Sequence, residues 1–211
     1  MKNLATLFAM TFVGLGTALA QGTIDFHNPG GASGFPVTVI DAAGKVTKIG
    51  DTAAGSPLGP ASVRVGLFVG ANGTPFSGMT MVGLTTNSAS SASLAIGTFF
   101  GGNPYVVPGF ATGTTISFAF AAWSITTGAL TYPDALIAGQ GYVSHTPVVG
   151  NGYTLAGGAG TPPLTWGDKT LAPPAGQPWM VSGLQLQPVP EPSTIVLGLL
   201  GAGALLLRRR K

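Results

Sequence analysis

Glycine and proline limit the structures that this chain can form. Its 211 residues include 34 Gly and 17 Pro. Each Gly inside a helix costs about 1 kcal/mol relative to Ala and each Pro about 3 kcal/mol, so long helices are disfavoured along most of the chain. Short strands joined by many turns tolerate both residues, and the hydrophobic fraction of 45% is enough for a packed core. The composition therefore predicts an all-β fold.

Short apolar runs bounded by turn residues occur throughout residues 21–187, a normal length for one domain. Residues 37–40 and 46–49 flank a turn and predict a hairpin. Residues 63–69 place alternate apolar side chains on one face and lead to Asn72-Gly73, a strong turn signal. The other expected elements are a return strand at 79–85, the longest strand at 114–123, a helix at 133–138, a strand around Leu184 and Leu186, and irregular stretches at 50–60 and 155–177. This spacing predicts a single antiparallel β-sandwich or jelly-roll-like domain.

The first 20 residues have the three parts of a secretory signal peptide. Lys2 provides the positive charge, residues 4–19 are mostly apolar, and Ala18 and Ala20 occupy the positions that signal peptidase reads. Cleavage after Ala20 would make Gln21 the first residue of the mature chain.

Residues 188–211 have the composition of a short membrane-sorting tail. The motif consists of Val189, Pro190, Glu191, Pro192, Ser193 and Thr194, and the basic end consists of Arg208, Arg209, Arg210 and Lys211. The uncharged segment 195–207, part of a helix expected at about 193–207, spans about 20 Å, less than the roughly 30 Å hydrocarbon core of a bilayer. Such a short transmembrane helix suits transient retention, with the basic end in the cytoplasm and the domain outside.

This order of Pro-Glu-Pro, apolar helix and basic end resembles the PEP-CTERM sorting signal of Gram-negative bacteria. Residues 21–28, 65–70, 107–110 and 120–124 are loosely similar to segments of PEP-CTERM proteins of the Verrucomicrobia type. The resemblance implies recognition by exosortase, a membrane protease or transpeptidase, with release to the cell surface or an exopolysaccharide matrix. An ordinary C-terminal anchor is the alternative.

Charge and cysteine content exclude several functions. Residues 21–187 contain four basic and five acidic residues, a net charge of −1, so the domain lacks the basic surface that nucleic acids require. The basic residues that raise the total to +3 lie in the two terminal segments. Without Cys, the chain has no disulfide, thiol nucleophile or Cys metal site.

No combination of polar residues predicts a catalytic site. Ser144, His145 and Asp134 are the nearest set to a catalytic triad, but closeness in sequence does not place a base against a nucleophile. The Asp residues are scattered, several beside turns, and Asp25 with His27 is a weak metal-ligand pair. We expect no enzyme activity, cofactor or metal.

Two tryptophans are the candidate glycan contacts. Trp166 and Trp179 lie in the Pro- and Gly-rich stretch, where their rings either bind sugar or pin the loop onto the sandwich. The leading hypothesis is a non-enzymatic surface or matrix protein. The alternatives are a carbohydrate-binding module in an exopolysaccharide matrix and, less favoured, a secreted hydrolase.

Overall fold

The computed structural model describes residues 21–28, 35–90, 92, 95–157, 160–166 and 183–190. The strands are β1 (Gln21–His27), β2 (Val37–Ile40), β3 (Val46–Lys48), β4 (Val63–Ala71), β5 (Thr80–Thr86), β6 (Phe100–Ala111), β7 (Thr115–Ser124), β8 (Tyr142–Val143), β9 (Val148–Thr154) and β10 (Leu184–Pro188). The helices are α2 (Tyr132–Leu136) and the 3-10 turns η1 (Phe76–Gly78) and η2 (Ile125–Thr127).

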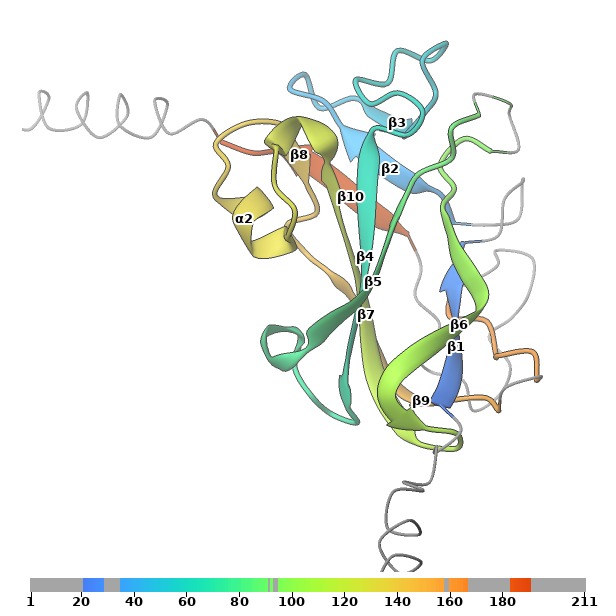
Figure 1. Cartoon of the computed structure of the whole chain (residues 1–211). Helices are drawn as coiled ribbons and strands as arrows, with labels where there is room; N and C mark the ends of the chain where they lie inside the picture. Colours follow the sequence, from blue (N-terminus) through green and yellow to red (C-terminus); the bar gives the residue numbers. More distant parts are fainter. Residues whose placement is uncertain are drawn as a thin grey trace, which may run out of the picture.

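The strands form two sheets that pack against each other (Figure 1). The larger sheet has the order β3-β2-β10-β8-β7-β4-β5, and β9 pairs with β7. The smaller sheet consists of β1 and β6. The expected all-β sandwich is confirmed. One pair departs from the antiparallel expectation, because β10 lies parallel to β2.

The centre of the larger sheet follows the alternation in the sequence. The β4 side chains Val63, Val65 and Leu67 are fully buried, and β7 contributes Phe118 and Phe120 to the same face. The β1 residues Ile24 and Phe26 cover this face from the smaller sheet. The ring of Phe26 is stacked on that of Phe120, with 5.9 Å between the two centroids, and lies 5.8 Å from the ring centroid of Phe99. This interface is the main core of the domain.

The opposite face of β7 is buried as well. Ala119 and Ala121 have 0% exposure because α2 and η1 cover them. Together with Trp123 of β7 and Tyr132 and Ala135 of α2 they belong to a second hydrophobic cluster. The helix begins one residue earlier than expected: Thr131 caps it, Pro133 lies in its first turn, and it ends at Leu136. Small residues on this face of β7 therefore make room for a helix rather than for solvent.

The longest strand is β6, with 12 residues, whereas β7 has 10. The prediction that residues 114–123 form the longest strand was therefore wrong. Gly101, Gly102, Pro104 and Gly109 made this segment resemble loop sequence. In the structure β6 pairs with β1 through several register shifts, which accommodate these residues.

The two hairpins expected at 37–49 and 63–85 are present, as β2–β3 and β4–β5. The strand expected around Leu184 and Leu186 is β10, and both of its leucines are buried. Among the described residues, no helix is long and apolar enough to cross a membrane. The predicted signal peptide (1–20) and tail helix (about 193–207) lie outside the described residues.

Candidate functional site

The first residues of the predicted sorting tail are part of the folded domain. Pro188 is the last residue of β10 and pairs with Tyr142 of β8. The backbone N–H of Val189 donates to the carbonyl of Gly141 at 2.9 Å, and its side chain is 6% exposed. Pro190 is exposed. The domain therefore extends two residues beyond the expected boundary at 187, up to the Pro-Glu-Pro sequence, whose remaining residues lie outside the described ranges.

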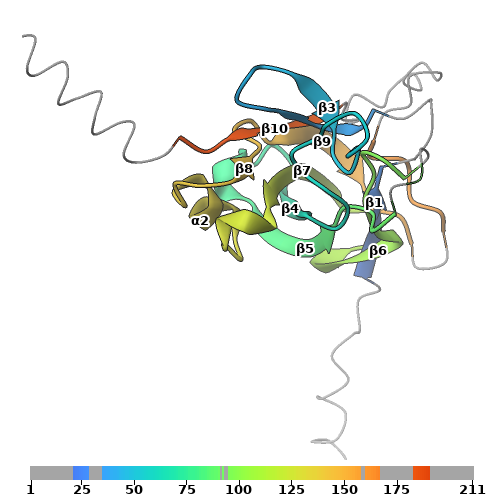
Figure 2. The same cartoon turned by 90° about the horizontal axis from the view of Figure 1, so that it is seen from above.

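The other predicted processing point adjoins the fold in the same way. Gln21 is exposed and is the first residue of β1, where it pairs with Ala111 of β6. Ala18 and Ala20 lie outside the described residues. The start of β1 and the end of β10 lie far apart, on opposite sides of the domain in both views (Figures 1 and 2).

The structure places Trp166 in the core and not on the surface. Its side chain is 0% exposed, its ring lies 5.4 Å from that of Phe99 and 5.3 Å from that of Phe120, and its Nε1 donates to the carbonyl of Phe35 at 2.6 Å. A ring enclosed in this way presents no face to a sugar, so the expected glycan contact at Trp166 is corrected to a packing role. Trp179 lies outside the described residues.

Asp25 and His27 are brought together at the end of β1. His27 Nδ1 is hydrogen-bonded to Asp25 Oδ1, and the backbone N–H of Thr165 donates to Asp25 Oδ2 at 3.3 Å. Burial raises the pKa of the Asp25 carboxyl above its ordinary value, and the contacts with His27 and Thr165 oppose part of that rise. Both carboxylate oxygens already have partners. Among the described residues no three His, Cys, Asp or Glu side chains group together to hold a metal ion.

The residues considered for a catalytic triad are not arranged as one. Ser144 is fully buried, and its Oγ accepts the backbone N–H of Ala122 at 2.9 Å. Asp134 lies in the first turn of α2, where Thr131 Oγ1 donates to its Oδ2 at 2.6 Å. His145 is exposed and lines a different hollow, beside Thr38 and Gln185. Each side chain thus has a local structural environment separate from the others.

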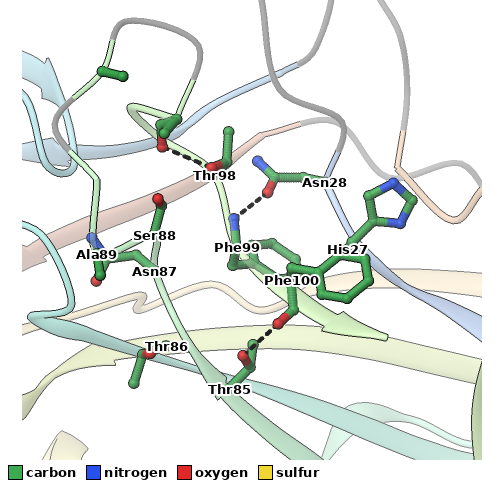
Figure 3. Close-up of a pocket in the computed structure, with 12 residues that line it drawn as sticks. His27, Asn28, Thr85, Thr86, Asn87, Ser88, Ala89, Thr98, Phe99 and Phe100 are labelled. Carbon is green, nitrogen blue, oxygen red and sulfur yellow. Dashed lines mark hydrogen bonds between the residues drawn. The ribbon is translucent and has the colours of Figure 1, made fainter. Parts of the chain in front are cut away.

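A hollow of about 590 Å³ lies where β5 and the segment before β6 meet, at the end of β1 (Figure 3). Phe100 is 67% exposed at its rim, and its ring centroid lies 5.7 Å from that of His27. Its other lining groups include Thr85, Thr86 and Ser88. Sequence reasoning missed this site. The available signal was Phe99-Phe100, because adjacent residues in extended chain point to opposite faces and both cannot enter one core.

Comparison with known proteins adds one match. Residues 188–211 match the model of the PEP-CTERM protein-sorting motif. No curated protein and no solved structure matches the chain. The similarity to Verrucomicrobia-type proteins stays a prediction. The matched segment begins at Pro188, the last residue of β10. Because of this match, the chain carries a PEP-CTERM protein-sorting motif and is an exported protein, transiently anchored in a membrane before processing by an exosortase-type enzyme.

Proposed function

We propose that this protein is a non-enzymatic component of the cell surface or extracellular matrix. Signal peptidase would cut between Ala20 and Gln21, and the exosortase-type enzyme would cut near Pro190-Glu191-Pro192. The observation that carries the proposal is that Gln21 is already part of β1 and that Val189 is packed in the core of the domain. The two predicted cuts would thus release the folded unit intact, with almost no unstructured chain at either end.

The use of polar groups inside the domain supports a structural role. Asn28 joins β1 to the segment before β6, because its Oδ1 accepts the N–H of Phe99 at 2.6 Å and its Nδ2 donates to Gly97 at 2.8 Å. Asn87 binds the N–H of Val63 at 2.9 Å. Buried polar groups that are satisfied in this way stabilise loops and strand ends. Asp25 and Ser144 are also hydrogen-bonded within the fold. This structural use of the buried polar side chains favours a cargo domain over a hydrolase.

The sorting step can be tested by intact mass of the cell-associated and released protein. We expect a released form that begins at Gln21 and lacks the segment after the Pro-Glu-Pro. Glu191→Ala should leave the tail attached and the protein in the membrane fraction. Gln187→Ala is the matched control, because Gln187 is exposed on β10 and lies outside the motif. A full-length tail on released wild-type protein would contradict the proposal.

A carbohydrate-binding module is the second candidate function, and Phe100 is the observation that favours it. An exposed aromatic ring can pack against the apolar face of a sugar, as buried rings pack against aliphatic groups. The hydroxyls of Thr86 and Ser88 line the same hollow and can hydrogen-bond to sugar hydroxyls. This site replaces Trp166 as the place where a polysaccharide of the matrix would bind.

A glycan array with exopolysaccharide fractions tests this candidate. Phe100→Ala should abolish binding, whereas Val106→Ala should not, because Val106 is exposed on the same strand but does not line the hollow. Equal binding by the two variants, or no binding by the wild type, would reject the carbohydrate-binding function and leave the structural role.

A further inference from the structure

Exposed apolar side chains concentrate around α2. Nine large apolar side chains of the described residues are exposed, and four of them lie between Ile125 and Ile137. The two most exposed of all are in this group: Ile137 is 81% exposed and Leu130 is 68% exposed. Ile125 and Leu136 complete the set, which we call the α2 patch. Single exposed apolar residues are normal, but four within thirteen consecutive residues make this segment the candidate interaction surface of the described chain.

Packing of α2 against the sheet does not account for the α2 patch. Tyr132 and Ala135 point inward and are buried against β7 in the second cluster. Leu136 is exposed within α2, and Ile137 follows it directly. A helix that needs only to cover a sheet has a polar outer face, whereas the outer face here combines Asp134 with the exposed Leu136 and, directly after the helix, Ile137.

The α2 patch carries almost no charge. Asp134 is the one ionisable acidic or basic residue between positions 125 and 141, and it is engaged with Thr131 at the start of α2. Besides the apolar side chains, the other exposed residues there are uncharged: Thr126, Gly128, Thr131, Pro133 and Gln140. Arg64 of β4 reaches this segment, where its Nη1 donates to the carbonyl of Ala129. With one acidic and one basic side chain the surface is close to neutral, so it suits an apolar or interfacial environment more than attraction to anionic lipid from a distance.

The chain leaves the domain beside this patch. Val189 packs in the same cluster as Tyr132 and Ala135, and Figure 1 shows the end of β10 emerging next to α2. The uncharged segment of the sorting tail begins at Ile195. The six residue steps from Val189 to Ile195 span at most about 20–22 Å when fully extended. While the tail is in the bilayer, the face of the domain beside α2 must therefore stay close to the lipid.

We propose that the α2 patch rests on the periplasmic surface of the inner membrane while the sorting tail is inserted. Ile137 and Leu130 enter the boundary between headgroups and acyl chains, and the rest of the sandwich projects away from the bilayer. This inference rests on the proposed sorting function and adds an orientation to it. It holds the Pro-Glu-Pro at the membrane surface, where a membrane-embedded enzyme can reach it.

The same contact is expected to be reversible. Stable attachment to a membrane surface takes two signals, such as a lipid chain or inserted segment together with a basic patch. The basic side chain that contacts this segment is Arg64, whose Nη1 donates to the carbonyl of Ala129. A single Arg near the surface adds only about 1 kcal/mol of attraction to anionic lipid, too little to act as the second signal once the tail is removed. Cleavage would then release the domain without any change in its fold.

Single-cysteine labelling of the full chain tests the orientation, because the natural sequence contains no Cys. Variants Leu130→Cys and Ile137→Cys carry a fluorophore, and Val106→Cys and Val149→Cys are matched controls because Val106 and Val149 are also exposed but lie on β6 and β9. Each labelled chain is reconstituted through its tail into phosphatidylethanolamine–phosphatidylglycerol vesicles that contain a nitroxide lipid. Unchanged urea midpoints in detergent establish that the labels leave the fold intact.

We expect the lipid nitroxide to quench the labels at 130 and 137 several-fold more than those at 106 and 149. Equal quenching at all four positions in chains that float with the vesicles would overturn the orientation and leave the sorting function standing. Labels at 130 and 137 that are shielded from aqueous iodide but not quenched by lipid would assign the patch to a second copy and would also overturn it. Failure to float with vesicles would overturn both the transient anchor and the orientation.

Discussion

At the scale of single residues, the buried carboxyl of Asp25 links two parts of the chain that are 140 residues apart. Its side chain is 0% exposed, its Oδ2 accepts the N–H of Thr165, and its backbone carbonyl accepts the Thr165 hydroxyl at 2.8 Å. His27 binds the other carboxylate oxygen. Burial is the largest cause of the raised pKa of Asp25, so the folded state holds the Asp25 proton more tightly than the unfolded state does.

Asp25→Asn should change how stability depends on pH. The stabilising contribution of Asp25 protonation is fully present below the unfolded pKa of 3.8 and is lost as the pH rises through the raised folded pKa. Asn has nearly the same shape and does not titrate. We therefore expect the urea midpoint of the wild type to fall relative to that of Asp25→Asn as the pH rises from about 3 to about 7. Parallel pH profiles would contradict this, and Asp41→Asn in an exposed turn controls for the loss of one carboxylate.

Trp166 and Phe100 provide a second residue-scale prediction, because one ring is buried and the other is 67% exposed. Trp166→Ala should lower the free energy of unfolding by about 3–5 kcal/mol, because it leaves a cavity in the core and removes the hydrogen bond from the indole N–H to the carbonyl of Phe35. Phe100→Ala should lower it by less than about 1 kcal/mol. Urea denaturation of both variants measures the difference. Similar small losses would place Trp166 outside the core.

At the scale of elements, β6 shows how glycine can permit a strand to pack. Gly101 lies over the ring of Phe26, where an added Cβ would overlap the ring carbons. Phe26 has no free space to move into, because it is 0% exposed and contacts Phe99, Tyr105 and Phe120. The absence of a side chain at position 101 is what allows β6 to lie against β1.

Gly101→Ala should therefore destabilise the domain, by about 1–3 kcal/mol, because the overlap forces the strand or the ring to shift. Gly59→Ala is the matched control: nothing lies within 4 Å of an added Cβ there. This control should be neutral or stabilising by about 0.4–1 kcal/mol, since Ala reduces the freedom of the unfolded chain. Thermal unfolding of the two variants distinguishes a packing effect from a general effect of replacing glycine. Equal midpoints would show that β6 tolerates a side chain at position 101.

The elements that could be predicted from the sequence are those determined by local alternation. In β4 and β7 every second residue enters the main core, and a period of two is a property of any extended backbone. β6 could not be recognised in this way, because its glycines and prolines are explained by its pairing with β1, about 80 residues away. The position of Trp166 likewise depends on Phe35 and Phe99, which no local pattern brings together. The sorting motif was predictable because a sequence of consecutive residues defines it.

At the scale of the whole molecule, the sorting motif and the folded domain share residues. The sorting motif begins at residue 188, yet Pro188 pairs with Tyr142 and Val189 fills part of the second cluster beneath α2. Predicting the boundary from composition alone placed it at 187, because proline marks the end of most ordered segments. Within the larger sheet β10 lies between β2 and β8: Leu184–Leu186 pair with β2, and its last two residues, Gln187 and Pro188, pair with β8.

This overlap limits where the exosortase-type enzyme can cut without damaging its product. A chain that ends at Gln187 loses the Tyr142 pairing, the buried Val189 side chain and the hydrogen bond from Val189 to Gly141. We expect its free energy of unfolding to be about 2–4 kcal/mol below that of a chain ending at Pro190. A chain ending at Val189 should match the longer one, because Pro190 is exposed. Urea midpoints of the three chains, each beginning at Gln21, measure this. If the chain ending at Gln187 is as stable as the others, residues 188 and 189 do not contribute to the stability of the domain. The enzyme could then cut before them without damaging its product.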